Sequence, residues 1–340
     1  MTARQYPNPE LELLTGGVRA RIGTVSSGTG TSATVGQPVD LPAARSSRIR
    51  AAEAALEAGE LGVAEFRVLL RADVSQAFYE VLQRREELVL ARDNQRLLDE
   101  IRDRIRIRVN VGEAPRLELT RAEAEAQVAA NQAASARLAV SRAMNRLRAA
   151  VGGALPANAD VAGELPATVQ LPDLDGLRAE VLARYPGLAR SAAELKRADA
   201  RLENERALRT PQPTVFAGFD RDPETSRTLF GVSIPLPVWN QRQGQIGEAL
   251  AERAQAEANL DARRVALVAE VEDAYARLQV ANQQIAAFEG GLLRQAEAAL
   301  RVAEAAYRFG ERGFIEVLDA QRVLRSVRSD YLAARYEGQQ

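Results

Sequence analysis

The sequence predicts a mainly α-helical protein with a small β part, and three observations lead to this fold class. Ala, Arg, Glu and Leu dominate the 340 residues and aromatic residues make up only 5%, which is typical of long helices and coiled coils. Apolar residues recur at alternating steps of three and four over very long stretches. The chain also repeats one plan of strands and helices, so we expect a two-fold internal repeat.

The repeat consists of four matched stretches that occur in the same order and with nearly the same spacing, which rarely arises by chance. They are Val35-Gly36-Gln37-Pro38 with Val232-Ser233-Ile234-Pro235, Ala77-Phe78 with Ala274-Tyr275, Val111-Gly112-Glu113 with Phe309-Gly310-Glu311, and Leu117-Glu118-Leu119 with Ile315-Glu316-Val317. We therefore expect a first half over 1–151, a linker rich in Gly, Ala and Pro over 152–172, and a second half over 173–340.

Each half contains a pair of segments in which apolar and polar residues alternate, and this period of two predicts strands. Phe230, Val232 and Ile234, for example, share one face. The strands are expected within about 10–39, as 10–25 and 31–39, and within about 214–236, as 214–219 and 227–236. Ser27-Gly28-Thr29-Gly30 and Asp222-Pro223-Glu224 are the predicted turns.

A very long helix follows each strand pair, over about 43–111 and about 241–309. The coiled-coil seam of the first contains Leu70, Val74, Ala77, Val81, Leu88, Ala91 and Leu98, and that of the second contains Leu267, Val271, Ala274, Leu278, Ala281, Ile285, Phe288 and Leu292. At 1.5 Å per residue, each helix would span roughly 100 Å, which suits the wall of a tube. Gly290-Gly291 interrupts the second helix and either permits bending or is harmless.

Each long helix ends at a glycine, Gly112 or Gly310, which is a C-terminal cap signal. Tight tips over 112–115 and 310–313 then lead into returning helices over about 116–151 and about 314–340. Pro115 fits the first turn of its helix.

The second half begins with an additional helix, about 174–208, that has no counterpart in the first half. Met1 to Glu10 also lack the basic-then-apolar pattern of a signal peptide. We therefore expect that an N-terminal helix and an export signal are missing from this sequence.

Composition excludes several functional classes. The chain has no Cys and no His, so thiol and imidazole catalysis, disulfides and ordinary zinc sites are excluded, and we expect no cofactor and no metal site. Lys and Arg number 45 against 46 Asp and Glu, with both signs interleaved, so no nucleic-acid partner is expected. The sequence contains no run of about 18 apolar residues, so we expect no transmembrane helix.

Four strands cannot close a barrel, and an open sheet edge is not tolerated in lipid. Either the strands form a small soluble sheet, or several chains pool them. Three chains of four strands give a 12-stranded β-barrel, a usual size in the outer membrane. The same trimer would assemble the long helices into a coiled-coil α-barrel with buried seams and solvated charged faces.

Two stretches are especially distinctive, the second strand-to-helix junction and the second tip. They read Gly231-Val-Ser-Ile-Pro-Leu-Pro-Val-Trp-Asn-Gln-Arg-Gln-Gly244 and Ala306-Tyr-Arg-Phe-Gly-Glu-Arg-Gly-Phe-Ile-Glu-Val-Leu-Asp-Ala-Gln-Arg322. With Asn8-Pro9-Glu10-Leu11 they resemble the TolC family of outer-membrane efflux proteins, and most of all its heavy-metal branch of the cobalt-zinc-cadmium type. The resemblance covers essentially the whole chain.

The resemblance implies a homotrimer with its β-barrel in the outer membrane and its helical barrel in the periplasm. Such a protein is a passive exit duct and not an enzyme. Its implied partners are a periplasmic adaptor protein, an inner-membrane pump of the RND type and outer-membrane lipid. The duct opens by loosening its periplasmic end.

Glu316 and Asp319 lie three residues apart and share a helix face just beyond the second tip. The resemblance places them at the narrowest periplasmic aperture, where a trimer would form rings of carboxylates that favour cations. The alternative is that they are ordinary solvated acids.

Tyr307, Arg312 and Glu118 are the predicted lock of the tip. The resemblance implies that Tyr307 and Arg312 bond to an acid on the first tip, which here is Glu118 where the family archetype has Asp. An interhelical contact without a gating role is the alternative.

The tip turns are the predicted docking surface for the adaptor, with Gly112 and Glu113 in the first turn and Gly310 and Glu311 in the second. Plain helical hairpin turns are the alternative.

Two other functions compete with the duct. A soluble coiled-coil scaffold would use the same helices outside any membrane. An enzyme with paired carboxylates, such as a glycosidase, is disfavoured because no aromatic sugar platform lies near the acids. The cargo stays open between metal cations and other small molecules. With only two Met, and no His or Cys, the chain offers no relay for soft metals, so any metal selectivity would lie in the pump.

Overall fold

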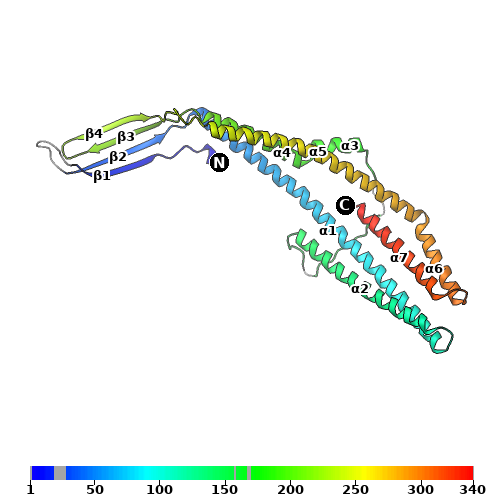
Figure 1. Ribbon diagram of the computed structural model, residues 1–340. Helices are drawn as coiled ribbons and strands as arrows, with labels where there is room; N and C mark the ends of the chain where they lie inside the picture. The colour runs from blue at the N-terminus through cyan, green and yellow to red at the C-terminus, as the bar shows by residue number, and fades with distance from the viewer. Residues whose placement is uncertain (1, 19–27, 157, 167–169, 340) are drawn as a thin grey trace. The chain divides into compact units, whose positions relative to one another are not determined.

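The computed structural model describes residues 2–18, 28–156, 158–166 and 170–339 (Figure 1). The chain forms two compact units, one of Met1–Glu65 with Leu182–Leu267 and one of Phe66–Val181 with Val268–Gln340. The first unit therefore takes one stretch from each repeat half, and the second unit takes the linker and the rest of both halves. The elements are a 3-10 helix Thr2–Arg4, β1 Glu10–Val18, β2 Gly28–Pro38, α1 Pro42–Asn110, α2 Arg116–Ala150, α3 Leu174–Arg184, α4 Pro186–Ala207, β3 Thr214–Arg221, β4 Ser226–Ser233, α5 Gln243–Ala287, a π-helical turn Phe288–Leu292, α6 Leu293–Arg308 and α7 Phe314–Glu337.

The first unit contains an antiparallel sheet with the strand order β1-β2-β3-β4. Leu13 pairs with Ala33, Ala33 with Phe219, and Ala217 with Phe230, which fixes the register across all four strands. Among the described residues, the two outer strands, β1 and β4, each have one edge without a partner strand. A mainly α-helical fold with four short strands is therefore confirmed.

The two faces of the sheet differ in polarity, because residues paired directly across strands point to the same side. One face is mainly apolar in its middle, where it carries Leu11, Leu13, Ala33, Val35, Val215, Ala217, Phe219, Phe230 and Val232, and it also carries the polar residues Thr15, Thr29, Thr31, Gln37, Arg221, Ser226 and Thr228. This apolar face is open to its surroundings, since Leu13 is 68% and Phe230 81% exposed. The opposite face carries Glu10, Glu12, Ser32, Thr34, Asp220 and Arg227, together with Leu14, Phe216 and Leu229.

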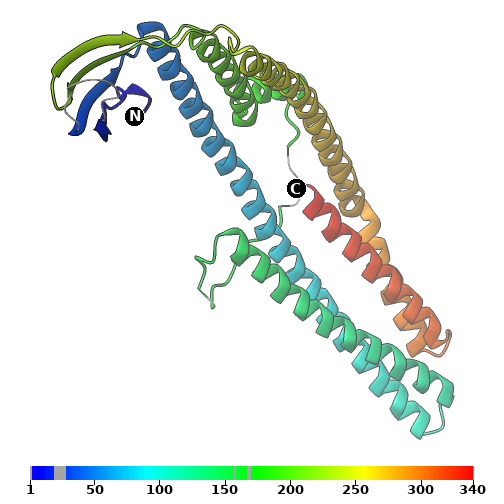
Figure 2. The same cartoon turned by 60° about the vertical axis from the view of Figure 1, so that its left-hand side comes forward.

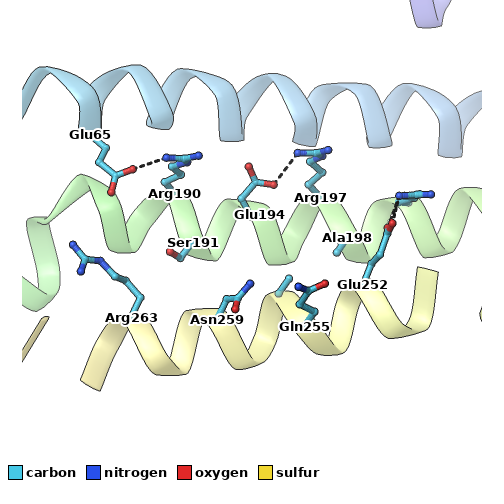
Figure 3. Close-up of a pocket in the computed structure, with 12 residues that line it drawn as sticks. Glu65, Arg190, Ser191, Glu194, Arg197, Ala198, Glu252, Gln255, Asn259 and Arg263 are labelled. Carbon is cyan, nitrogen blue, oxygen red and sulfur yellow. Dashed lines mark hydrogen bonds and ion pairs between the residues drawn. The ribbon is translucent and has the colours of Figure 1, made fainter. Parts of the chain in front are cut away.

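The helices of the first unit are joined by ion pairs more than by large apolar side chains. Their buried positions are mostly small, such as Ala54 and Ala58 of α1 and Ala193 and Ala198 of α4. The pairs between α1 and α4 are Arg50–Glu203 (3.1 Å), Glu57–Lys196 (2.6 Å) and Glu65–Arg190 (2.8 Å; Figure 3). The pairs between α4 and α5 include Asp199–Arg253 (2.6 Å) and Arg201–Glu252, and Glu205 of α4 pairs with Arg242, the residue just before α5. Four of these side chains, Glu65, Arg190, Arg201 and Glu252, help to line a polar groove of about 510 Å³.

The second unit has true apolar cores. Figure 2 shows α2 running back along α1, and α7 running back along α6. One core consists of Leu98, Ile101 and Ile105 of α1, Ala122 and Ala129 of α2, and Phe314, Val317 and Leu318 of α7. The other consists of Ala77, Val81 and Leu82 of α1, Ala143, Met144 and Leu147 of α2, and Val161 and Leu165 of the predicted linker. The segment over 152–172 thus contributes to a core as well as joining two halves.

Two helices expected to be continuous are interrupted. Over 174–208, α3 ends at Arg184 and α4 begins with Pro186, because the residue before a proline is driven out of the helical region and Tyr185 is extended (φ −68°, ψ 118°). Over 241–309, α5 ends at Ala287 and the π-helical turn containing Gly290-Gly291 precedes α6. That turn lies against α7, where Tyr331 donates a hydrogen bond to Glu289 (2.9 Å).

The first strand pair differs from its expected bounds. β2 begins at Gly28, because Gly28-Thr29-Gly30 continue the ladder opposite Val18, Gly17 and Gly16 and do not form the turn. The expected continuation of the first strand to Val25, and the start of the turn at Ser27, lie outside the described residues. Pro115 is the N-cap of α2, with an extended backbone, and not a residue of its first turn. Within the described ranges, no helix combines the length and apolar character needed to cross a membrane.

Candidate functional site

The first tip is closed by a hydrogen-bonded helix cap. Gly112 lies in the left-handed region (φ +82°), where a side chain would be strained. The N–H of Gly112 donates to the carbonyl of Val109 (3.1 Å), and the N–H of Glu113 donates to the carbonyl of Arg108 (2.8 Å). This pair of bonds is the Schellman cap, which satisfies the last carbonyls of α1 and reverses the chain.

The second tip repeats this backbone arrangement. Gly310 has φ +77°, and its N–H donates to the carbonyl of Tyr307 (3.1 Å). The N–H of Glu311 donates to the carbonyl of Ala306 (2.9 Å). The glycine-acid pairs predicted as docking turns therefore occupy equivalent positions in two matching caps, with both acidic side chains exposed.

Tyr307 contacts Glu118 between the two hairpins. Its hydroxyl donates to the Glu118 Oε2 atom at 3.5 Å, and both residues are half-buried. Behind this contact, Phe314 and Val317 of α7 are buried in the core shared with α1 and α2. The polar contact therefore lies at the margin of an apolar joint between the α1–α2 and α6–α7 hairpins.

Arg312 does not complete the predicted lock in the described part of this chain. Its Nη1 atom lies 3.2 Å from the Glu316 Oε1 atom, four residues along. A carboxylate at that spacing is within easy reach of Arg312, whereas Glu118 belongs to the other hairpin. Within the described chain Arg312 thus makes a local ion pair, and its bond to Glu118 stays a prediction.

The predicted aperture carboxylates are both accompanied by arginines. Glu316 pairs with Arg312, and Asp319 lies 3.7 Å from Arg322. Arg322 also contacts Glu125 of α2. Asp319 is exposed and Glu316 is half-exposed, so both carboxylates are open to solvent in a single chain.

Arg108 is a residue of the tip that the sequence reasoning missed. Its guanidinium carbon lies 5.1 Å from the centre of the Tyr307 ring. The centre of the Phe314 ring lies 6.0 Å from the centre of the same Tyr307 ring. Burial and then the charge of Glu118 raise the pKa of Tyr307, while the charge of Arg108 opposes this rise. The available signal was a basic side chain in the last turn of α1, four residues before Gly112.

A groove of about 470 Å³ lies beside this contact and is lined by residues that include Leu97, Ile101, Arg104, Arg108, Glu113 and Tyr307. It combines apolar side chains with charges of both signs. In the part of the chain that the structure describes, no group of three or more His, Cys, Asp or Glu is placed to hold a metal ion.

Comparison with known proteins gives a consistent family. The sequence matches the family described as outer membrane efflux protein over residues 1–153 and 177–340. It is 32% identical over 334 residues to the cobalt-zinc-cadmium resistance protein CzcC of Cupriavidus metallidurans, covering 98% of this chain and 78% of CzcC. It is 25% identical over 285 residues to the cation efflux system protein CusC of Escherichia coli K12, covering 80% of this chain and 62% of CusC.

Solved structures agree in fold. A crystal structure of CusC matches with a TM-score of 0.76 at 20% identity, covering 99% of this chain and 81% of that one. The outer-membrane channel OprN matches with a TM-score of 0.82 at 17% identity, covering 99% and 80%. The family and heavy-metal branch that the sequence motifs predicted are confirmed. The chain therefore belongs to the outer membrane efflux protein family, whose members are efflux channels of the outer membrane and not enzymes.

Proposed function

We propose that this chain is one protomer of a homotrimeric exit duct that carries metal cations out of the periplasm. It works with a periplasmic adaptor protein and an inner-membrane pump of the RND type, which supplies the energy. The sheet lies in the outer membrane and the helices project into the periplasm. The observation that carries this proposal is the four-stranded sheet, with one apolar face and two open edges.

The sheet cannot face lipid alone, because unpaired backbone N–H and C=O groups at its edges would be left without hydrogen bonds. Neighbouring copies solve this when β4 of one copy pairs with β1 of the next. Successive strands of the sheet alternate in direction, so the pairing of β4 with β1 of the next copy is antiparallel like the others. Three copies of four strands give a closed barrel of twelve, with Leu13 and Phe230 turned to lipid and Glu12 and Asp220 turned to the lumen.

A pair of adjacent residues in β4 tests this orientation. Phe230 belongs to the apolar face and Leu229 to the opposite face. Phe230→Arg places a charge in lipid at a cost of about 2–4 kcal/mol near the bilayer centre, so we expect the trimer to be lost from outer-membrane fractions. Leu229→Arg, the matched control, is expected to assemble.

Assembly is measured by native mass spectrometry of the detergent-extracted protein and by ion conduction in planar bilayers. We expect a trimer that forms conducting pores. A monomer or dimer that stays in solution without detergent would contradict the duct and favour a coiled-coil scaffold.

The tip is proposed to be closed in this conformation. The Tyr307–Glu118 hydrogen bond and the packing of Phe314 and Val317 hold the two hairpins together. Opening the duct requires the α6–α7 hairpin to move away from α1 and α2, so this joint is the proposed gate. Arg312 supports it indirectly by holding Glu316.

Docking of the adaptor is proposed at the two tip turns. Gly112 with Glu113, and Gly310 with Glu311, present the same backbone cap and an exposed carboxylate. Because the same motif occurs at both tips, an adaptor could make similar contacts with both hairpins.

The cation cargo is proposed from two observations. The relative CzcC, at 32% identity, is named for resistance to cobalt, zinc and cadmium. Glu316 and Asp319 would also place carboxylate rings at the aperture of a trimer, which favour cations. The chain has no His, no Cys and two Met, so discrimination among metals is assigned to the pump.

A further inference from the structure

One side chain touches both the proposed gate and a tip turn. The guanidinium carbon of Arg108 lies 5.1 Å from the centre of the Tyr307 ring. Its Nε atom lies 4.0 Å from a carboxylate oxygen of Glu113, the acid of the first tip turn. Arg108 is half-buried, so these contacts limit the positions that its side chain can adopt.

We propose that Arg108 is a positioning residue of the tip, which holds the Tyr307 ring with its hydroxyl toward Glu118 and links this contact to the first tip turn through Glu113. The inference rests on the proposed gate. It extends that gate to Arg108, which lies on the same hairpin as Glu118 and faces Tyr307 on the other hairpin. It also gives the first tip turn a physical connection to the gate.

The ring of Tyr307 must be held in place, because a phenol can donate to Glu118 from only a narrow range of side-chain angles. The hydrogen bond is long, at 3.5 Å, so a small rotation of the ring would break it. A planar guanidinium over an aromatic face is attracted to the ring and restricts this rotation. Phe314, at 6.0 Å, is fixed in the core and supports the same ring.

The link to Glu113 follows from the shared guanidinium. Glu113 attracts the cation toward the turn, while Tyr307 attracts it toward the gate. A movement of the turn that changes the Glu113 contact therefore changes the hold on Tyr307. The charge of Arg108 also opposes the rise in the pKa of Tyr307 that burial and Glu118 produce, consistent with its closeness to the phenol.

Arg104 offers a matched control on the same helix. It lines the same groove, one turn earlier, and pairs with Glu100 on α1 (3.8 Å). Replacing Arg104 removes the same charge from the groove while leaving the contact between Arg108 and Tyr307 in place.

The test measures single-channel conductance of the purified full-length channel in planar bilayers, after trimer yield has been checked for each variant. We expect Arg108→Gln to raise conductance roughly two- to fivefold, as loss of a partly exposed cation–π contact implies. Arg104→Gln should leave conductance unchanged. Arg108→Lys, which keeps the charge, should restore at least part of the closure, a rescue not expected if Arg108→Gln merely disordered the tip.

Two double variants test whether Arg108 acts through Tyr307 and whether Glu113 acts through Arg108. Arg108→Gln added to Tyr307→Leu should raise conductance no further than Tyr307→Leu alone. Glu113→Gln should change conductance in the parent channel and have no effect when Arg108 is already Gln.

The outcomes separate the inference from the gate on which it rests. If Glu118→Gln and Tyr307→Leu raise conductance but Arg108→Gln does not, the role of Arg108 is overturned and the gate stands. If none of these variants changes conductance, the gate itself is wrong. An equal effect of Arg104→Gln would also overturn the inference, because groove charge alone would then explain the result.

Discussion

The side-chain amide of Gln321 in α7 donates a hydrogen bond to the side-chain oxygen of Asn94 in α1. Both residues are 7% exposed, although Leu98, Val317 and Leu318 nearby form an apolar core. Two buried side-chain amides can form their hydrogen bond only when they face each other. Leucine side chains, in contrast, still pack when one helix shifts along the other. This pair therefore fixes the register between the two hairpins close to the tip.

Asn94→Leu is expected to destabilise the protein by about 1–3 kcal/mol, because the amide of Gln321 is left buried without a partner. Gln321→Leu should do the same to Asn94. The double variant removes both polar groups and should cost less than the sum of the two single changes. Denaturant unfolding of the detergent-solubilised protein measures this, and strictly additive costs would argue against a specific pair.

The gate predicts different effects for its three sequence-predicted members. Glu118→Gln weakens the Tyr307–Glu118 hydrogen bond and Tyr307→Phe removes it, so we expect the ratio of open to closed channels to rise by roughly two- to tenfold. Arg312→Ala should have a smaller effect, since Arg312 pairs with Glu316 and not with Glu118. Single-channel recording measures the ratio. A larger effect of Arg312→Ala would show that its contacts in the assembled trimer differ from those within one chain.

The Tyr307 contact should be insensitive to pH across the neutral range. Burial, followed by the charge of Glu118, raises the pKa of Tyr307 above the usual value of 10.0. A group with a raised folded pKa contributes stability that is complete below its unfolded pKa and is lost as pH rises through the folded value. Conductance of the parent channel and of Tyr307→Phe should therefore differ by a constant factor between about pH 6 and pH 9. A difference that disappears within this window would mean that the phenol titrates there.

The carboxylates near the aperture are expected to set ion preference. Replacing Glu316 and Asp319 together by Ala removes two negative charges per chain and leaves Arg312 and Arg322 with fewer acidic partners. Cation preference should fall, which appears as a shift in the reversal potential in a salt gradient. Glu311→Ala, an acid in the adjoining turn, is the control. Equal shifts from the control and the double variant would assign the preference to general surface charge.

The fold class was predictable because its signals are local. Alternating residues such as Phe230 and Val232 define a strand, and steps of three and four along α1 define a coiled-coil seam. Contacts made over long distances in sequence left no comparable signal. Val161 and Leu165 stand in a stretch rich in Gly, Ala and Pro, yet they are buried against α1 and α2.

The site was predictable only in part, for the same physical reason. The family motif brought Tyr307 and Glu118 together, and the structure places them in contact. Arg108 belongs to the other hairpin, and no local spacing relates it to Tyr307. The pair of Arg312 with Glu316 was not predicted, although Glu316, four residues away, can reach Arg312 without any tertiary contact.

The packing of α4 against α1 in the first unit, which relies on ion pairs, should be destabilised more by salt than the apolar core of the second unit. Exposed pairs such as Glu57–Lys196 contribute at most about 1 kcal/mol each, and at 1 M salt the screening length falls to about 3 Å. We expect amide hydrogen exchange in α4 to accelerate between low and high sodium chloride, while exchange around Ile105 changes little. Lys196→Gln should reduce the salt response of α4, and Lys196 pairs with no acid besides Glu57 among the bridges described for it. Equal salt responses in α4 and around Ile105 would mean that the packing of Ala193 and Ala198, and not the ion pairs, holds α4 in place.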